Sequence, residues 1–109
     1  MSKSPRPDTV DSHTYRVRCG CGNLYITVGY WDGQVREIFI QLGKAGGCET
    51  VQMEALGRMV SLVLRCGATT EEVVEQLFKL TCPKSIPGGA ASCPDAVTIA
   101  LKKATSIRD

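Results

Sequence analysis

The dipeptide Asp32-Gly33 stands between two segments of strong β-strand character, and this arrangement limits the folds open to the chain. Both segments, residues 23–31 and 34–42, are rich in β-branched and aromatic residues, and the second places aliphatic residues at alternate positions. An Asp-Gly pair supplies the positive φ that a tight primed turn requires. The sequence therefore predicts an antiparallel hairpin, which a further strand over residues 15–18 is expected to extend.

Three helices are predicted after this hairpin. Beyond Gly47 the apolar period changes from two to about 3.6 residues, and a helix is expected to continue to Gly67. Thr69 and Glu72 form a capping box that opens a second, shorter helix. A loop rich in Pro and Gly follows, and residues 95–104 form the third helix. Apolar residues recur on one side of the first helix: Val51, Ala55, Met59, Leu62, Val63 and Cys66. We therefore predict an α+β domain, a short antiparallel sheet packed against three helices.

The length of 109 residues fits one compact domain, for which we predict residues 15–105, with a disordered tail at 1–14 and a short tail at 106–109. The first 14 residues lack the apolar core of a signal peptide or membrane anchor. The apolar segments elsewhere are interrupted by charges well short of the roughly 20 residues that span a bilayer. We expect a soluble, cytoplasmic protein without a membrane partner. The net charge of +2, with dispersed basic residues, does not indicate a nucleic-acid partner.

Four of the six cysteines fall at the ends of predicted elements. Cys21 lies between two strands, Cys48 opens the first helix, Cys82 follows the second, and Cys93 opens the third. A reducing cytosol favours thiols or metal ligands over disulfides. Their spacing matches no C-x-x-C finger. The hypothesis of a four-cysteine site that joins element ends therefore rests on the location of these cysteines at the ends of predicted elements. A helix N-terminus also favours the thiolate form that metals bind.

The stretch Ser92-Cys93-Pro94-Asp95 is typical of a helix start. Ser92 is a good N-cap, and a proline is tolerated in the first turn because its missing N–H has no partner there. Four converging thiolates predict a closed, tetrahedral zinc site, and an iron–sulfur cluster is the alternative with the same ligands. Cys66 is expected to pack as a small apolar residue. For Cys19 two alternatives stay open: its side chain points away from the four-cysteine site, or it serves as an alternative ligand.

A glycine-rich segment, Gly43-Lys44-Ala45-Gly46-Gly47, lies between the last strand and the first helix. Backbone N–H groups at such a point can hold a phosphate, and the lysine adds charge. A nucleotide or phosphorylated ligand bound by Gly43, Lys44, Gly46 and Gly47 is therefore an alternative function. The residue order does not fit a P-loop, and such glycines more often just permit a turn.

Several separated motifs resemble the TSCPD domain, a module near the C-terminus of vitamin B12-dependent ribonucleotide reductases that also occurs as small stand-alone proteins. The resemblance covers about residues 15–104. It rests on residues 21–28, 42–52, 62–67, 81–83 and 92–96, with Ala91 where the family name has threonine. The family's shared cysteines fall at Cys21, Cys48, Cys82 and Cys93.

The resemblance implies an accessory or binding domain, stabilised by metal and linked to deoxyribonucleotide synthesis. A reductase of that class needs a large barrel, a cobalamin site and a mobile thiol pair, for which this chain has no room. We therefore expect no catalysis by this chain alone and at most a module of ribonucleoside-diphosphate reductase, with the reductase large subunit or a nucleotide as partner. Cobalamin belongs only to the full-length relatives.

Other chemistry has little support in the sequence. His13 lies in the polar N-terminal segment, and the carboxylates are dispersed over helix faces, so we name no catalytic residue. Thiol redox chemistry is a second alternative, for which Cys19 and Cys21 form the closest pair in sequence. The open edges of a short sheet make a homodimer the expected assembly.

Overall fold

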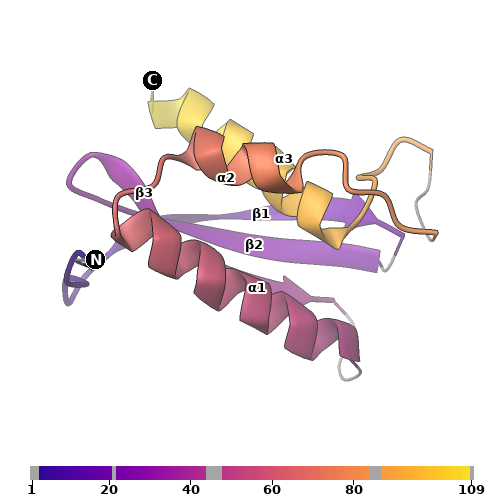
Figure 1. Ribbon diagram of the computed structural model, residues 1–109, viewed down its shortest axis with the longest axis horizontal. Helices are drawn as coiled ribbons and strands as arrows, with labels where there is room; N and C mark the ends of the chain where they lie inside the picture. The colour runs from indigo at the N-terminus through magenta and orange to yellow at the C-terminus, as the bar shows by residue number, and fades with distance from the viewer. Residues whose placement is uncertain (1–2, 21, 44–47, 84–86, 109) are drawn as a thin grey trace.

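The computed structural model describes residues 3–20, 22–43, 48–83 and 87–108, with side chains up to residue 105 (Figure 1). Three strands come first and three helices follow: β1 (Asp11–Cys19), β2 (Gly22–Trp31), β3 (Gln34–Leu42), α1 (Cys48–Arg65), α2 (Thr70–Leu77) and α3 (Cys93–Arg108). The predicted α+β class is confirmed.

The strands form one antiparallel sheet in the order β1-β2-β3. At the predicted hairpin Asp32 has φ 55° and Gly33 has φ 72°, the positive values of a tight primed turn. Ile26 at the centre of β2 pairs with Tyr15 on β1 and Ile40 on β3. Residues in this register share one face of the sheet, so the alternation seen in the sequence builds a continuous apolar surface.

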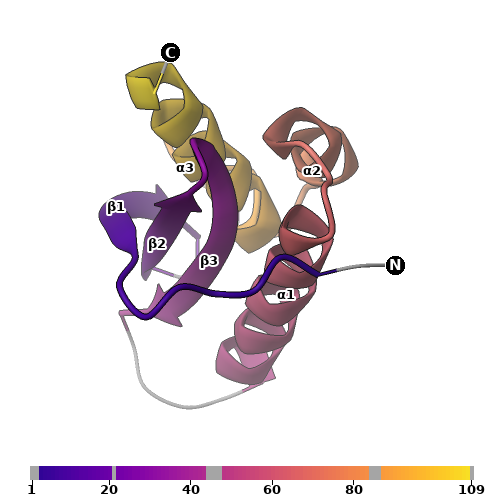
Figure 2. The same cartoon turned by 90° about the vertical axis from the view of Figure 1, so that its left-hand side faces the viewer.

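The helices cover that apolar surface (Figure 2). α3 packs on β1 and β2, α1 packs along β3, and α2 packs on α3. The other face of the sheet carries the exposed side chains of Phe39 and Tyr25. The largest fully buried apolar side chains come from both layers: Leu24, Ile26, Val28, Ile38, Leu64, Val97 and Leu101.

The buried side of α1 differs from the apolar side read from the sequence. Its buried residues are Met53, Gly57, Val60 and Leu64, whereas Val51, Ala55 and Met59 are exposed. Gly57 faces β3, and a Cβ built there would lie 3.7 Å from the Ile38 carbonyl oxygen, an ordinary contact distance. The side of α1 that packs on β3 is therefore the one with Met53, Gly57, Val60 and Leu64, and the second apolar stripe stays on the surface.

A serine joins α1 to the edge of the sheet at the same place. The Ile38 N–H donates to Ser61 Oγ at 2.9 Å, and the Ser61 hydroxyl donates to the Ile38 carbonyl at 3.0 Å. Both backbone groups of an edge-strand residue are thereby satisfied by one side chain, which fixes the position of the helix along the strand.

The predicted helix starts are confirmed. Thr69 Oγ1 accepts from the Glu72 N–H at 3.1 Å, and the Glu72 carboxylate accepts from the Thr69 N–H at 2.9 Å, which completes the capping box of α2. Ser92 Oγ accepts from the Asp95 N–H at 3.1 Å and caps α3. The predicted buried positions of α3 are also buried: Ala96, Val97, Ala100 and Leu101. None of the helices in the described parts of the chain is long and apolar enough to span a bilayer.

The domain boundaries extend beyond those predicted at 15 and 105. β1 begins at Asp11, and the segment before it is held against the body of the domain; α3 continues to Arg108. Ser4 N–H donates to the Arg65 carbonyl at 2.8 Å. His13, expected in a tail, lies in β1, and its Nδ1 is 3.2 Å from the Tyr30 hydroxyl. The segment 1–14 is thus not a tail throughout, because its polar residues find distant partners.

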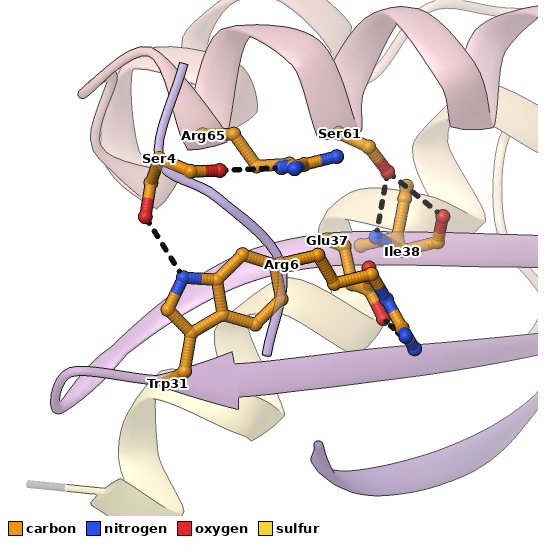
Figure 3. A network of polar contacts seen from close by, with 7 residues as sticks. All are labelled: Ser4, Arg6, Trp31, Glu37, Ile38, Ser61 and Arg65. Carbon is orange, nitrogen blue, oxygen red and sulfur yellow. Dashed lines mark hydrogen bonds and ion pairs between the residues drawn. The ribbon is translucent and has the colours of Figure 1, made fainter. Parts of the chain in front are cut away.

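We call the network that holds this segment the N-terminal clamp: Ser4, Arg6, Trp31, Glu37 and Arg65 (Figure 3). Trp31 Nε1 donates to Ser4 Oγ at 3.0 Å, and Arg65 Nε donates to the Ser4 carbonyl at 3.0 Å. Arg6 donates to both carboxylate oxygens of Glu37, at 2.8 and 3.1 Å. This bidentate pair satisfies a carboxylate whose residue is only 4% exposed.

Candidate functional site

The end of β1, the start of α1 and the start of α3 lie at one end of the molecule, on the right in Figure 1. We call this region the cysteine end. Cys19 is the last residue of β1, Cys48 the first of α1 and Cys93 the first of α3, and Cys82 in the loop before α3 donates its N–H to the Ala91 carbonyl. Cys66 follows α1 at the opposite end. The antiparallel course of the chain therefore brings these element ends to one side of the molecule, whereas the predicted four-cysteine site stays a prediction.

Two of these cysteines are in contact inside the core. Cys19 Sγ lies 3.5 Å from Cys93 Sγ, although 74 positions separate the residues in sequence. Cys19 is 2% exposed and Cys93 8% exposed. Cys19 is the last residue of β1 and faces inward, as Val17 does two positions earlier, and Cys93 is the first residue of α3. A strand end and a helix start thus bring two thiols together without solvent between them.

The sulfur separation suits two ligands of one tetrahedral metal ion. With Zn–S bonds of about 2.3 Å, tetrahedral geometry places two thiolate sulfurs about 3.8 Å apart. Within the described residues, however, no three His, Cys, Asp or Glu side chains lie close enough together to hold a metal ion. The described part of the chain therefore provides one pair of suitable donors.

The predicted four-cysteine set is only partly represented at this pair. Cys93 belongs to it, whereas Cys21 lies outside the described residues. Cys82 is half-buried, and its N–H donates to the Ala91 carbonyl at 3.0 Å, two residues before Cys93. Cys48 is exposed at the start of α1. The partner that the structure gives Cys93 is Cys19, the residue whose role the sequence left undecided.

Asp95 is the main polar anchor of the cysteine end. Its carboxylate accepts from the Lys79 N–H at 2.8 Å, from the Ala91 N–H at 3.0 Å and from the Thr98 hydroxyl at 3.3 Å. Lys79 has φ 58°, a conformation that residues with a side chain seldom adopt. The carboxylate therefore ties both ends of the loop between α2 and α3 to the first turn of α3, next to the thiol pair.

The carboxyl group of Asp95 is ionised, which suits it to accept these hydrogen bonds. Burial raises the pKa of its carboxyl, but the N–H donors of Ala91 and Lys79, the Lys79 ammonium and the Thr98 hydroxyl together lower it by more. The resulting pKa lies below the ordinary value, so the group stays ionised at neutral pH. A residue that is 1% exposed and fully engaged with neighbouring donors is an anchor and not an acid or base for a substrate.

The predicted phosphate loop is described only at its first residue. The Gly43 N–H donates to the Asn23 carbonyl at 2.9 Å, as in the last rung of a ladder between β2 and β3. That N–H is therefore bonded to β2 and is not directed at a ligand. Lys44, Gly46 and Gly47 lie outside the described residues, and their role stays a prediction.

A groove of about 580 Å³ lies between α1 and the edge of β3, on the side of the N-terminal clamp. Charged side chains line it, and two pairs neutralise each other: Arg6 with Glu37, and Arg58 with Glu54 at 3.0 Å. Both glutamate carboxylates form ion pairs with these arginines. The groove therefore has the character of a solvated seam between two elements.

Sequence reasoning left open the role of Cys19, whose sulfur lies 3.5 Å from that of Cys93. The signal for Cys19 was present, because Tyr15, Val17 and Cys19 alternate along β1 and Val17 is apolar. Strand alternation places Cys19 on the same face as Val17, which is the core face. The inward direction of Cys19 could thus have been predicted, whereas its contact with α3 depends on tertiary packing.

Comparisons with known proteins agree with the sequence motifs. The family model of the TSCPD domain matches residues 2–105. The vitamin B12-dependent ribonucleotide reductase of Agrobacterium fabrum (strain C58 / ATCC 33970) is 33% identical over 104 residues, which are 94% of this chain and 8% of that reductase. The chain thus spans a small part of the curated relative it matches. No solved structure matches the chain.

Proposed function

This chain belongs to the TSCPD domain family, and we propose that it is an accessory module of deoxyribonucleotide synthesis that docks on a ribonucleotide reductase. One observation carries the proposal: nearly the whole chain is similar to a small part of a vitamin B12-dependent ribonucleotide reductase. A match of this kind relates the chain to a region of the enzyme, and the rest of the enzyme has no counterpart here.

The chemistry of the described residues supports a module without catalysis of its own. The thiols of Cys19 and Cys93 are buried, and the carboxylate of Asp95 is occupied by the N–H groups of Lys79 and Ala91. A nucleophile or general base must reach its substrate, and these groups face the protein interior. Their arrangement favours a role in holding the domain together.

We further propose that thiolates of the cysteine end hold a structural zinc ion, with an iron–sulfur cluster as the alternative cofactor. The set predicted from the sequence is Cys21, Cys48, Cys82 and Cys93. The sulfur contact at Cys93 and the gathering of element ends in Figure 1 support a thiolate site in this region. Bound zinc would supply a closed cross-link between elements, and binding free energy of that kind adds directly to folding stability.

A reconstitution experiment tests the docking proposal. The purified chain is added to the cognate large reductase, and association is measured by sedimentation velocity alongside the rate of ribonucleotide reduction. We expect a complex and a change in turnover, with an unrelated domain of similar size as the control. Absence of a complex, with turnover unchanged at saturating concentration, would contradict the proposal.

A further inference from the structure

We propose that the sheet face opposite the helices binds single-stranded nucleic acid, with bases stacked on Tyr25 and Phe39 and phosphates held by Arg16 and Arg18. The helices pack on the apolar face of the sheet and leave this other face uncovered (Figure 2). The inference goes beyond docking on a reductase and uses none of the cysteines.

The two halves of this outer face differ in what covers them. Near the Asp32-Gly33 turn the N-terminal clamp lies over it, and Trp31 is 8% and Glu37 4% exposed. Toward the other end Tyr25 is 36% and Phe39 53% exposed. We call this part the open half, made by the outward side chains of residues 14–18, 23–27 and 39–41.

The strand register brings the aromatic and basic side chains of the open half together. Tyr25 pairs with Arg16 on β1 and with Gln41 on β3, and in the next row Thr27 pairs with Phe39. Tyr25 and Phe39 thus hold diagonal positions on neighbouring strands, which are about 7–8 Å apart. Two exposed rings at this separation can each receive one of two successive bases of an extended nucleic-acid chain.

The charge of the open half is positive. Its segments 14–18, 23–27 and 39–41 contain Arg16 and Arg18 and no Asp or Glu. Both arginines are exposed, and neither forms an ion pair within the described part of the chain. The charge therefore favours an anionic occupant. It disfavours a second copy of this chain, because two such faces would bring like charges together.

The combination of rings and arginines on a flat sheet identifies the kind of anion. Single-stranded nucleic acids stack their bases on exposed aromatic rings and place their phosphates on basic groups. An acidic protein segment would employ the arginines but not the ring faces. A free nucleotide fits a flat surface poorly, because small-molecule sites are concave and bury most of the ligand.

Packing across the strands is the competing explanation for the two aromatic residues. A cross-strand contact between Tyr25 and Phe39 stabilises a sheet through apolar area. Base stacking needs the face of the ring as well. Leucine at either position keeps apolar area and removes the ring, so this replacement separates the two explanations.

The first experiment measures binding of a fluorescein-labelled oligothymidylate of about 12 nucleotides by fluorescence anisotropy. Variants are first checked for folding by circular dichroism. Phe39→Leu and Tyr25→Leu should each bind at least about fivefold more weakly, because stacking of one base is lost. Arg16→Gln should also bind more weakly and reduce the slope of log K against log salt by about 0.7, the change expected for one phosphate contact.

Phe78→Leu and Lys103→Gln are the matched controls. Phe78 is an exposed aromatic residue at the end of α2, and Lys103 is an exposed cation on α3, both away from the outer face of the sheet. Both variants should bind as the wild type does. A duplex of the same length should bind more weakly than the single strand, because its bases are not available for stacking.

A second experiment uses only the wild-type chain, so a variant that fails to fold does not weaken the test. An oligonucleotide that carries 5-bromouracil is irradiated with the protein, and crosslinked peptides are identified by mass. We expect crosslinks at Tyr25 and Phe39. Crosslinks confined to other elements would overturn the proposed surface.

The remaining outcomes test the occupant. Absence of binding at about 100 µM protein and low salt overturns the proposal, since even non-specific contacts reach that affinity. Unchanged binding by both leucine variants, or equal affinity for the duplex, would show charge attraction without stacking and overturns it too. Polyglutamate that competes as well as unlabelled oligothymidylate would assign the surface to an acidic protein segment instead. None of these results bears on the proposed docking to a reductase.

Discussion

The two ends of this domain are held together by different chemistry. At the N-terminal clamp, charged and aromatic side chains meet strong partners: Arg6 binds Glu37 through two hydrogen bonds, and Trp31 donates to Ser4. At the cysteine end, two buried thiols touch at 3.5 Å with only weak hydrogen bonding between them. The clamp rests on charge-assisted and indole N–H hydrogen bonds, whereas the thiol pair contributes a buried contact between two sulfur atoms.

Asp95 provides the strong polar contacts of the cysteine end. Its carboxylate gathers N–H groups from both ends of the loop before α3, as the clamp carboxylate of Glu37 gathers the guanidinium of Arg6. Both carboxylates are buried, with Asp95 1% and Glu37 4% exposed, but Asp95 accepts from two backbone N–H groups whereas the Arg6 side chain is 44% exposed. Polar contacts of similar length should therefore differ in their effect on stability.

The largest effect is expected from Asp95→Ala. The substitution leaves the partly buried N–H groups of Lys79 and Ala91 without their acceptor, and the loop before α3 loses its tie to the first turn of the helix. We expect a loss of about 3 kcal/mol in the free energy of unfolding, measured by urea denaturation. A loss smaller than that of the clamp variant below would reverse the comparison between the ends.

The pH dependence of stability tests the charge of Asp95. Because its pKa is lower in the folded state than the ordinary 3.8, the unfolded chain binds more protons in the acid range. Its contribution is complete above the ordinary value and is lost as pH falls through the lower folded pKa. The wild type should therefore lose more stability than Asp95→Asn between about pH 5 and pH 2. Parallel curves for the two proteins would show that the carboxylate carries no such linkage.

A smaller effect is expected at the clamp. Glu37→Gln removes one charge of the pair with Arg6 and one of its two good acceptors, but the released guanidinium is partly in solvent. We expect about 1 kcal/mol of destabilisation, and less at high salt. Glu54→Gln is the matched control, because its pair with Arg58 is exposed and should contribute under about 0.5 kcal/mol. Equal effects of the two variants would remove the distinction between the clamp and an ordinary surface pair.

The smallest effect, and one of opposite sign, is expected midway between the ends. Gly57 lies in the interior of α1, and an added Cβ would meet Ile38 and Ile40 at 3.7 Å, an ordinary contact distance. Gly57→Ala should gain helix propensity without a clash, raising stability by about 0.5 kcal/mol. A fall in the melting temperature would show that the close approach of α1 and β3 needs the glycine itself.

The sequence predicted well what depends on neighbours along the chain. The turn at Asp32-Gly33, the capping box of Thr69 with Glu72 and the serine cap of α3 each follow from local backbone chemistry, and all are confirmed. The three-stranded antiparallel order of the sheet also follows from short connections between neighbouring strands.

Features that depend on packing between distant segments were not predictable in the same way. α1 has two apolar sides, and which of them packs on β3 depends on contacts with distant residues such as Ile38 and Ile40. The N-terminal segment before and within β1 is held in place by hydrogen bonds to residues far along the chain, such as Glu37 and Arg65. The contact of Cys19 with Cys93 joins β1 to α3 in the same way. The zinc ion, the homodimer and the phosphate loop stay predictions.

The most direct measurement is amide hydrogen exchange of the wild-type chain before and after treatment with a zinc chelator. A metal at the cysteine end predicts a selective loss of protection at the N–H groups of Ala90 and Cys82, which bridge to β1 and to the loop before α3. The Ile38 N–H, bonded to Ser61 beside the N-terminal clamp, should keep its protection. Unchanged exchange at all three amides, or equal loss at all three, would contradict a structural metal confined to the cysteine end.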